Sequence, residues 1–206
     1  MKLWLVRHGQ TEANVAGLYS GHSETALTAQ GMRQATEVGQ LLSGVRFDRV
    51  LCSALGRAKH TAHLMLEGRD QAIEINPLLN EMHFGDWEMR HHRDLQHEDA
   101  VTYAAWCQDW QNTVPTNGEG FQSFSQRILS LSEELRAMPQ ENILVVSHQG
   151  VLSLLIATLM GMPPPSLWHF MIEQGSWSMV EIHQNFVTLR TLNNRAAAVQ
   201  GSGEVL

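Results

Sequence analysis

Two histidines follow two apolar segments of the chain at the point where each segment ends. Leu3–Val6 leads into Arg7 and His8, and Ile143–Val146 leads towards His148. Short apolar runs of this kind are typical of buried strands in a parallel sheet. Because the carboxyl ends of parallel strands form the ligand crevice of an open sheet, we expect the two imidazoles to meet at one edge.

A third apolar segment, Val50–Cys52, brings Arg57 to the same edge. Guanidinium groups make planar, bidentate contacts with phosphate oxygens, and an imidazole with a fixed tautomer can act as a nucleophile. Hydrolysis of a phosphate monoester requires up to ~20 kcal/mol of barrier reduction. A phosphoryl-enzyme intermediate and cancellation of charge on the equatorial oxygens both supply it. The residue types therefore predict phosphoryl transfer in which the protein itself supplies the cations, so that no metal is needed.

The leaving alkoxide also needs a proton, and residues 78–88 contain three carboxyl groups that could donate it. Glu81 is flanked by apolar residues, where a carboxyl group facing a phosphate dianion could remain in its acid form. The residue types alone do not choose between Glu81, Asp86 and Glu88. The last two could equally be solvated residues or partners of the site's own side chains.

The elements that would position these groups follow a β-α-β-α order, which favours a parallel sheet with helices on its faces. Thr28 is a candidate N-cap, and residues 163–165 are three prolines that end a helix. Residues 67–120 have weak periodicity and predict an insertion that packs on one end of the sheet. The expected helices are 29–42, 54–66, 99–111, 121–138 and 151–160, and the expected strands are 3–6, 49–53, 143–146, 179–182 and 187–192.

Composition limits the possible functions. The chain has 206 residues, of which 43% are hydrophobic and 17% charged, and this predicts one globular domain over 1–195 followed by a flexible tail over 196–206. A formal net charge of −7 argues against nonspecific nucleic-acid binding. The two cysteines show no CxxC spacing, which favours a reducing, cytoplasmic location. The apolar runs are too short for a membrane span.

Five blocks of the sequence, in order, resemble the histidine phosphatase superfamily, which includes the cofactor-dependent phosphoglycerate mutases. The resemblance extends over nearly the whole chain, to about residue 195. The blocks are Arg7-His8-Gly9-Gln10-Thr11, Leu27-Thr28-x-x-Gly31-x-x-Gln34-Ala35, Ser53-x-Leu55-x-Arg57-Ala58-x-x-Thr61, Asn80-Glu81 with Phe84-Gly85-x-Trp87-Glu88, and Val145-Val146-Ser147-His148.

This resemblance implies a three-layer α/β/α sandwich with a mainly parallel sheet and an insertion over the active site. It implies that His8 is the phosphohistidine nucleophile and that Glu81 is the proton donor, and then the base for the attacking water. It implies neither a metal nor a cofactor. The phosphate clamp would consist of Arg7, Arg57 and His148, helped by Asn14. Gln149 is a departure, because the family usually has glycine there, and it bears on how closely a substrate can approach.

Three further segments resemble the α-ribazole phosphatase branch of this family, namely residues 17–22, 84–93 and 116–120. This resemblance implies a small phosphate ester as partner, either α-ribazole 5′-phosphate or its adenosylcobalamin-linked 5′-phosphate. It adds Ser20 and Gly21, together with Gln149, to the expected substrate-binding residues. Trp87, Trp106 and Trp110 of the insertion would suit a planar benzimidazole by stacking, and packing in the core is the alternative role for them.

The residue pattern is also compatible with other functions. A phosphoglycerate mutase must exclude water, usually with additional segments over the site, and this chain is short for that. A broad-specificity phosphatase and a phospho-ligand sensor are further alternatives, but binding alone would not need Glu81. The histidines at 83, 91, 92 and 97 suggest a metal site, yet their spacing fits no closed zinc pattern. The sequence does not indicate an oligomeric state.

Overall fold

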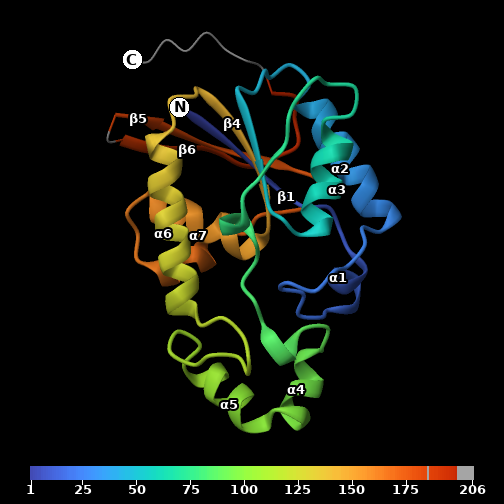
Figure 1. Ribbon diagram of the computed structural model, residues 1–206, viewed down its shortest axis with the longest axis vertical. Coiled ribbons are helices and arrows are strands. Elements are labelled where there is room, and N and C mark those ends of the chain that lie inside the picture. Colours follow the sequence, from blue (N-terminus) through green and yellow to red (C-terminus); the bar gives the residue numbers. More distant parts are fainter. Residues whose placement is uncertain (185, 199–206) are drawn as a thin grey trace.

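The computed structural model of the protein describes residues 1–184 and 186–198, and these contain a six-stranded sheet in the order β3-β2-β4-β1-β5-β6 (Figure 1). The central pairs β1–β4, β2–β4 and β2–β3 are parallel, and β5 runs antiparallel to β1 and β6. The mainly parallel sheet expected from the sequence is thereby confirmed. The strands are β1 (Lys2–Arg7), β2 (Arg49–Cys52), β3 (Glu74–Ile75), β4 (Asn142–Ser147), β5 (Trp177–His183) and β6 (Phe186–Asn194).

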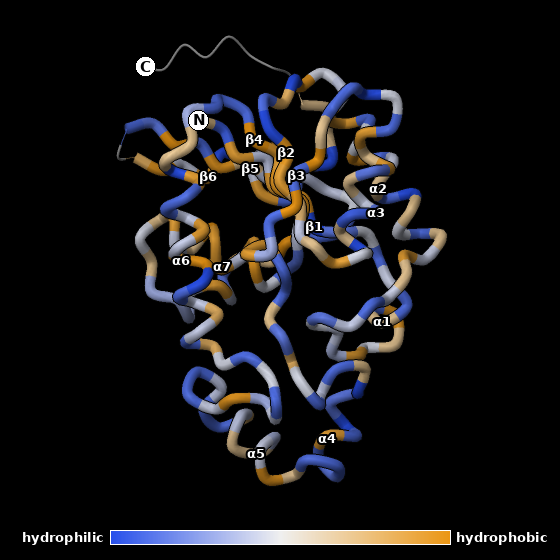
Figure 2. The backbone as a smooth tube through the Cα atoms, in the orientation of Figure 1, coloured by the Kyte–Doolittle hydropathy of each residue, from blue (hydrophilic) through white to orange (hydrophobic). Residues whose placement is uncertain are grey.

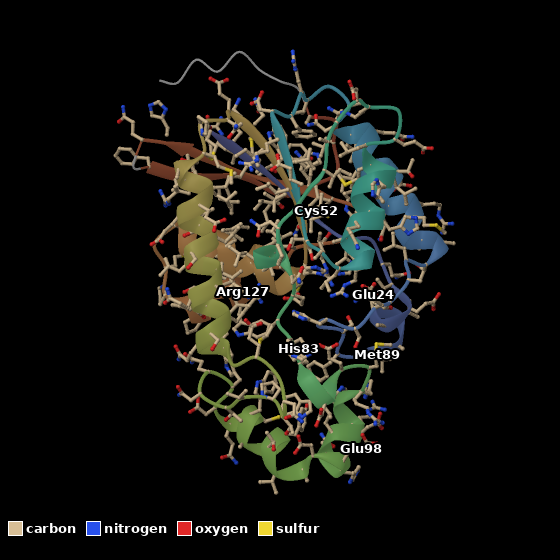
Figure 3. The ribbon with its side chains drawn as sticks, viewed as in Figure 1. Glu24, Cys52, His83, Met89, Glu98 and Arg127 are labelled. Atoms are coloured by element: carbon tan, nitrogen blue, oxygen red, sulfur yellow. The ribbon has the colours of Figure 1, made fainter. Side chains whose placement is uncertain are left out.

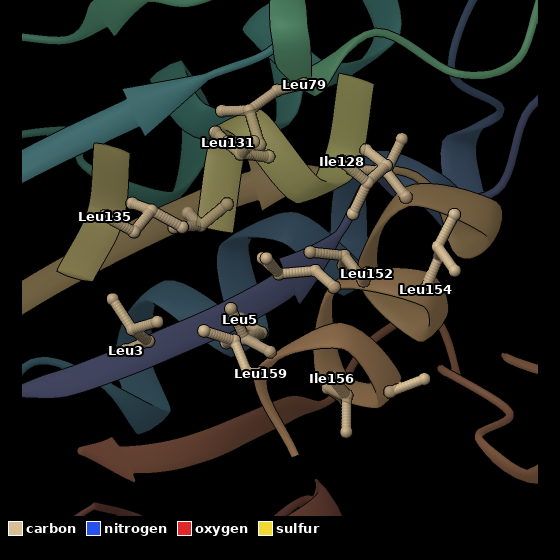
Figure 4. Packing of buried hydrophobic residues seen from close by; sticks show 14 of the residues in the cluster. Leu3, Leu5, Leu79, Ile128, Leu131, Leu135, Leu152, Leu154, Ile156 and Leu159 are labelled. Atoms are coloured by element: carbon tan, nitrogen blue, oxygen red, sulfur yellow. The ribbon is translucent and has the colours of Figure 1, made fainter. Parts of the chain in front are cut away.

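Strand β1 is buried on both faces because helices cover both sides of the sheet. Leu3 and Leu5 pack against α6 (Phe121–Ala137) and α7 (Gln149–Leu159), as Figure 4 shows at close range. Trp4 and Val6 point to the opposite face, towards α2 (Ala29–Leu41) and α3 (Gly56–Met65). Hydrophobic residues accordingly gather where the strands meet (Figure 2). The arrangement confirms the three-layer sandwich.

The N-terminal ends of α2 and α7 carry polar residues that lie near the carboxyl edge of the sheet. Thr28 caps α2 by accepting a hydrogen bond from the Gly31 N–H at 3.0 Å, as expected. Helix α7 begins at Gln149, two residues before the start predicted from the apolar pattern. The pattern missed this first turn because its side chains are polar or absent. As a result, Gln149 and Gly150 lie in the first helical turn, next to the carboxyl edge of the sheet.

Residues 67–120, which were expected to be an insertion, first contribute β3 to the edge of the sheet, and the chain then leaves the sheet in short helices. The expected helix at 99–111 is present as α5 (Ala100–Gln108), whereas the short helix before it, α4 (His92–Glu98), was not predicted; both lie far from the sheet (Figure 1). The chain bends at Asp99, whose carboxylate accepts hydrogen bonds from the Trp87 indole at 2.8 Å and from the Thr116 hydroxyl. Two 3-10 turns, η1 (Pro77–Leu79) and η2 (Gly85–Trp87), complete the insertion.

The chain after α7 contains more structure than the sequence indicated. The prolines at 163–165 end α7, but they also start the 3-10 helix η3 (Pro164–His169), which folds back against α7. At the other end, the expected tail is held in its first residues. The Ala198 N–H donates to the Leu41 carbonyl at 2.8 Å, and Trp177 donates to the Ala196 carbonyl at 2.9 Å. Residues 199–206 of the expected tail lie outside the described residues.

No helix in the described part of the chain combines the length and the apolar character needed to cross a membrane.

Candidate active site

The register of β1 and β4 places the two histidines side by side. Arg7 pairs with Ser147 at the carboxyl end of these strands, so His8 and His148 leave the sheet together. Their ring centroids are 5.1 Å apart, and both side chains are buried. The apolar runs thus bring the two imidazoles to one edge of the sheet, as the sequence predicted.

His8 is held in one tautomer. Its Nδ1 lies 2.7 Å from the Gly9 carbonyl oxygen, which can only accept, so Nδ1 carries the proton and Nε2 keeps its lone pair. Nε of Arg57 donates to that lone pair at 3.3 Å. Burial lowers the pKa of His8 well below its usual value, and the positive charges of Arg57 and Arg7 lower it further. His8 is therefore a neutral imidazole with Nε2 available as a nucleophile.

Gly9 fixes the backbone of this nucleophile against α2. A Cβ at Gly9 would lie only 2.2 Å from the carbonyl oxygen of Gly31, so no other residue fits without moving the helix. The Gly9 N–H also donates to the Thr61 hydroxyl at 3.0 Å. These contacts explain why glycines at positions 9 and 31 and threonine at 61 occur in the recognised sequence blocks.

His148 lies next to His8 and is held by a chain of hydrogen bonds. The Ser53 hydroxyl and the Ala54 N–H both donate to Oδ1 of Asn80 at 2.9 Å. Ser53 Oγ is therefore left to accept from Nε2 of His148 at 2.8 Å. Nδ1 of His148 is buried and has no hydrogen-bond partner among the residues described. Burial lowers the pKa of His148 well below its usual value, and the positive charge of Arg57 lowers it further.

Arg57 is buried in a ring of backbone carbonyl groups. Its Nη2 donates to the carbonyls of Ser20 and Gly21, both at 2.7 Å, and its Nη1 donates to the Ser23 carbonyl at 3.1 Å. Burial lowers the pKa of Arg57, and the nearby Glu81 carboxylate partly offsets this effect. Ser20 and Gly21 thus contact Arg57 through their backbone oxygens, a role that side-chain types did not reveal.

Glu88 anchors the loop that surrounds Arg57. The Glu88 side chain is only 9% exposed, and its carboxylate accepts from the N–H groups of His22 at 2.7 Å and Phe84 at 3.1 Å. It also accepts from the backbone N–H and the hydroxyl of Ser23. Although burial alone would raise the pKa of Glu88, these hydrogen bonds outweigh it and lower the pKa. Glu88 therefore joins the insertion to the 20–23 loop.

Arg7 reaches into the same site from the end of β1. Its Nη1 donates to the Ile172 carbonyl at 3.0 Å and to Oε1 of Gln149 at 3.3 Å. Its Nε is buried and has no hydrogen-bond partner within the described ranges. Burial lowers the pKa of Arg7, and the charge of Glu81 opposes that shift. Two guanidinium groups thus approach His8 from different elements.

The surroundings of Glu81 distinguish it from Asp86 and Glu88, the other two candidates for the proton donor. One oxygen accepts from the Met82 N–H at 3.0 Å, and the other accepts from the Gly150 N–H in the first turn of α7, also at 3.0 Å. Asp86 is exposed and accepts from the Asn117 side chain at 2.9 Å. Since Glu88 is occupied by the 20–23 loop, Glu81 is the carboxyl group placed to exchange a proton with a ligand.

Arg127 of α6 fixes the segment that leads to Glu81. It donates to the carbonyls of Leu78 and Asn80, both at 2.8 Å, and it pairs with the Glu119 carboxylate at 2.8 Å. Figure 3 shows Arg127 at α6, above the insertion. The side chain therefore ties the insertion to the sandwich.

A polar cavity of about 170 Å³ connects these groups. Seven of the site residues expected from the sequence line it, whereas His148 and Gly21 are not among its lining residues. Asn14, one of the seven, is oriented by the Thr11 N–H at 3.1 Å and the Gln174 amide at 2.8 Å. The lining residues are Arg7, His8, Asn14, Leu18, Tyr19, Ser20, Arg57, Glu81, Phe84 and Gln149.

An apolar cavity of about 300 Å³ adjoins the polar one and shares Tyr19, Glu81, Phe84 and Gln149 with it. Trp106 and Trp110 of the insertion line this cavity, whereas Trp87 is fully buried beside Leu95 and Tyr103. The other lining residues are Met82, Phe121, Phe124, Gly150, Leu167, Trp168, Phe170 and Met171.

The part of this wall that follows the prolines was not predicted from the sequence. Trp168 is 67% exposed, and its ring lies 5.7 Å from that of Trp110 in an edge-on arrangement. Prolines at the first positions of a helix are a start signal, so Pro164 and Pro165 could have predicted η3. Trp168 follows these prolines within a few residues in the sequence, and this spacing could have indicated that it belongs to the same short helix.

The four histidines at 83, 91, 92 and 97 do not converge. His83 stacks near His22 with ring centroids 4.7 Å apart, whereas His91 and His92 lie together at the start of α4. Within residues 1–184 and 186–198, no group of three or more histidine, cysteine, aspartate or glutamate side chains is arranged to hold a metal ion.

Comparison with known proteins identifies the family of this chain. The model of the histidine phosphatase superfamily (branch 1) matches residues 3–195. The adenosylcobalamin/alpha-ribazole phosphatase of Salmonella typhimurium is 64% identical over 197 residues, covering 95% of this chain and 98% of the relative. Its namesake from Escherichia coli K12 is 60% identical over 203 residues, covering 98% and 100%. The crystal structure of the alpha-ribazole phosphatase from Shigella flexneri superposes with a TM-score of 0.93 at 60% identity, covering 98% of this chain and 100% of that one. This chain belongs to the histidine phosphatase superfamily.

Proposed function

We propose that this protein is a phosphomonoesterase that uses His8 as its nucleophile and releases the 5′-phosphate of α-ribazole 5′-phosphate or of adenosylcobalamin 5′-phosphate. The observation that carries the proposal is the polar cavity around His8, which opens into an aromatic cavity. The two cavities share Glu81, so the proton donor lies between the phosphate and the aromatic group. This arrangement suits a phosphate ester whose alcohol carries a planar base. The relatives named above carry the same activity in their names.

In the first step, Nε2 of His8 attacks phosphorus along the line of the leaving oxygen. The N–P bond forms as the bond to the ribose 5′-oxygen breaks. Glu81, in its acid form, gives its proton to that oxygen, so the alcohol leaves neutral. Nε of Arg57, which donates to Nε2 at 3.3 Å in the free protein, is released when the lone pair is used. It can then follow the phosphoryl oxygens.

Arg7 and Arg57 supply positive charge to the equatorial oxygens, where negative charge accumulates in the transition state. Three backbone carbonyl groups hold Arg57 beside His8, which supports this role. His148 adds Nδ1, which is buried and has no partner within the described ranges. A phosphate dianion would favour the protonated form of His148, and Nδ1–H would then donate to an oxygen.

In the second step, water attacks the phosphohistidine, and the Glu81 carboxylate takes its proton. The N–P bond breaks, inorganic phosphate forms, and His8 regains its neutral state with the proton on Nδ1. Glu81 therefore ends the cycle protonated, as it began. The hydrogen bond from the Gly150 N–H at 3.0 Å holds this carboxyl group in place through both steps.

The aromatic cavity supports the choice of alcohol. Tyr19 and Phe84 stand where the two cavities meet, with ring centroids 5.0 Å apart. Trp168 and Met171 are 67% and 64% exposed, so the rim of this cavity is at the surface. A substrate larger than the cavity can therefore place its base inside and extend outwards past the rim, as adenosylcobalamin 5′-phosphate would.

The test is release of inorganic phosphate from α-ribazole 5′-phosphate, measured beside ribose 5-phosphate and 3-phosphoglycerate. We expect a clear preference for α-ribazole 5′-phosphate and an acid-labile, base-stable phosphoryl label on the protein. His8→Ala should abolish both, whereas the exposed control His63→Ala should leave both unchanged. Isomerisation of 3-phosphoglycerate would favour a mutase, and saturable binding without turnover would favour a sensor. Either result would refute the proposal.

A further inference from the structure

Gln149 makes hydrogen bonds with both ends of its side-chain amide. Its Oε1 accepts from Nη1 of Arg7 at 3.3 Å and from the Ile172 N–H at 2.9 Å. Its Nε2 donates to the Ser153 hydroxyl at 2.8 Å and to the Phe170 carbonyl at 3.2 Å. These four hydrogen bonds join three parts of the chain, namely β1, α7 and the segment 170–172. Gln149 is thus a bridge and not a free binding group.

The segment 170–172 has two roles at once. The side chains of Phe170 and Met171 line the aromatic cavity, and the carbonyl of Ile172 accepts from Nη1 of Arg7 at 3.0 Å. The same three residues therefore form a wall of one cavity and hold an arginine of the other. Gln149 lies at the boundary, since it lines both cavities.

The wall itself is incompletely covered in the free protein. Met171 is 64% exposed, and the neighbouring Trp168 is 67% exposed. An aromatic ligand in the cavity would cover part of this apolar surface and so stabilise the segment in the position seen here. Because Arg7 and Gln149 are bonded to that segment, the same event would fix Arg7 in the polar cavity.

We infer that Gln149 is a positioning residue that couples occupancy of the aromatic cavity to the placement of Arg7 in the phosphate clamp. The inference rests on the proposed function for the identity of the two ligand groups. Coupling of this kind is reciprocal, so an aromatic ligand tightens phosphate binding by the same factor as phosphate tightens binding of the aromatic ligand. A substrate that fills both cavities therefore organises the clamp, and a small phosphate ester does not.

The experiment measures binding with no turnover required. The affinity for inorganic phosphate is determined by calorimetry with and without saturating α-ribazole, the dephosphorylated nucleoside. We expect α-ribazole to tighten phosphate binding about fivefold to tenfold in the unchanged protein, within the usual range for coupled sites. In Gln149→Met, which has nearly the same shape but no amide, we expect this factor to fall to about one. Gln126→Met, on the exposed side of α6, is the matched control and should keep the coupling.

Equal coupling in Gln149→Met and in the unchanged protein would overturn the inference, as would the absence of coupling in the unchanged protein. Should Gln149→Met fail to fold, Gln149→Asn replaces it. Asparagine keeps the amide but is one methylene shorter, so it cannot reach Arg7 and Phe170 together. Loss of coupling in that variant, with an unchanged melting temperature, supports positioning and excludes a purely structural role.

A kinetic comparison separates failure of this inference from failure of the proposed function. The ratio of kcat/KM for α-ribazole 5′-phosphate over ribose 5-phosphate should fall about fivefold to tenfold in Gln149→Met, in line with the lost coupling. Equal losses on both substrates would show that Gln149 holds Arg7 but transmits nothing from the aromatic cavity, which contradicts the inference. If the unchanged protein hydrolyses neither substrate, the proposed function fails, and the binding measurement still decides the role of Gln149.

Discussion

Nε of Arg57 lies 3.3 Å from Nε2 of His8, so a permanent cation touches the atom that we propose as the nucleophile. A positive charge at this distance opposes protonation of the imidazole, and burial opposes it further. The same guanidinium would then neutralise the phosphoryl oxygens once the lone pair of Nε2 is used. Arg57 would therefore keep His8 unprotonated before attack and stabilise the charge on the phosphoryl oxygens during attack.

The first prediction concerns the pH dependence that this contact creates. His8 is active only when neutral, and its pKa lies well below the usual histidine value, so kcat/KM should persist to pH values below that usual value. Arg57→Met removes the charge and should raise the pKa of His8, which moves the acid limb of kcat/KM to higher pH. It should also lower kcat by about 10²–10³-fold, as expected for loss of a charge-stabilising donor.

Arg57→Lys is the control for that measurement, because it keeps the charge but not the Nε contact. Its acid limb should stay closer to that of the unchanged protein than the limb of Arg57→Met does. Comparing variants on one substrate cancels the ionisation of the phosphate ester itself. If the acid limb of Arg57→Met does not move, the charge of Arg57 does not control the protonation of His8.

The second prediction uses two leaving groups to test Glu81. Glu81→Gln cannot donate a proton, so hydrolysis of an alkyl phosphate such as α-ribazole 5′-phosphate should slow by about 10²–10⁴-fold. A p-nitrophenolate leaving group needs no proton, and phosphoryl transfer from p-nitrophenyl phosphate to His8 should slow much less. Burst kinetics on both esters check this. A loss of equal size on both esters in the burst phase would rule out Glu81 as the general acid.

The third prediction concerns Glu88, which holds the loop around Arg57. Glu88→Gln keeps the shape of the side chain but turns an amide N–H₂ towards backbone N–H groups. Leaving such donors unsatisfied costs about 1–3 kcal/mol each. We therefore expect the free energy of unfolding to fall by about 2 kcal/mol and kcat to fall with it, because Arg57 loses its support.

Denaturant unfolding and steady-state kinetics measure the two effects of Glu88→Gln together. The matched control is Glu98→Gln, where an exposed carboxylate pairs with the exposed Arg90 at 3.3 Å. A surface pair of this kind contributes little, so this variant should unfold and turn over like the unchanged protein. If both variants behave alike, the Glu88 carboxylate does not support the loop.

The fourth prediction concerns Trp168 at the rim of the aromatic cavity. Because its side chain is 67% exposed, Trp168→Ala should change the melting temperature little. It should raise KM for α-ribazole 5′-phosphate by about 5–20-fold, since stacking of an aromatic side chain on a base contributes about 1–3 kcal/mol. KM for ribose 5-phosphate should not change. Phe186→Ala, at a 75% exposed position on β6 and outside the residues that line the cavity, is the control and should alter neither KM.

The sequence predicted the strand-end placement of the site because that placement depends on local patterns. The apolar run of β1 and that of β4 each end just before a histidine, and parallel pairing brings those ends together. The roles of Ser20 and Gly21 could not be read in this way. They contact Arg57 through backbone carbonyls, which every residue type possesses, so the residue types carry no signal for the contact.

The aromatic cavity shows the same limit for contacts between distant segments. Trp110 and Trp168 are 58 positions apart in the chain, and only the fold of η3 against α7 brings them together. Helix α4 was missed for a different reason, because Leu95 is its one buried residue and its sequence carries little apolar pattern. The bend at Asp99 that separates α4 from α5 depends on hydrogen bonds from the Trp87 indole and the Thr116 hydroxyl, which a local pattern does not contain.

The carbonyl ring around Arg57 has a consequence for turnover. Carbonyl dipoles hold a guanidinium in place without cancelling its charge, and no hydrogen bond of Arg57 among the described residues goes to a carboxylate. The polar cavity is therefore attractive to free orthophosphate as well as to the phosphate group of an ester. The enzyme would thus slow as its own product, inorganic phosphate, accumulates.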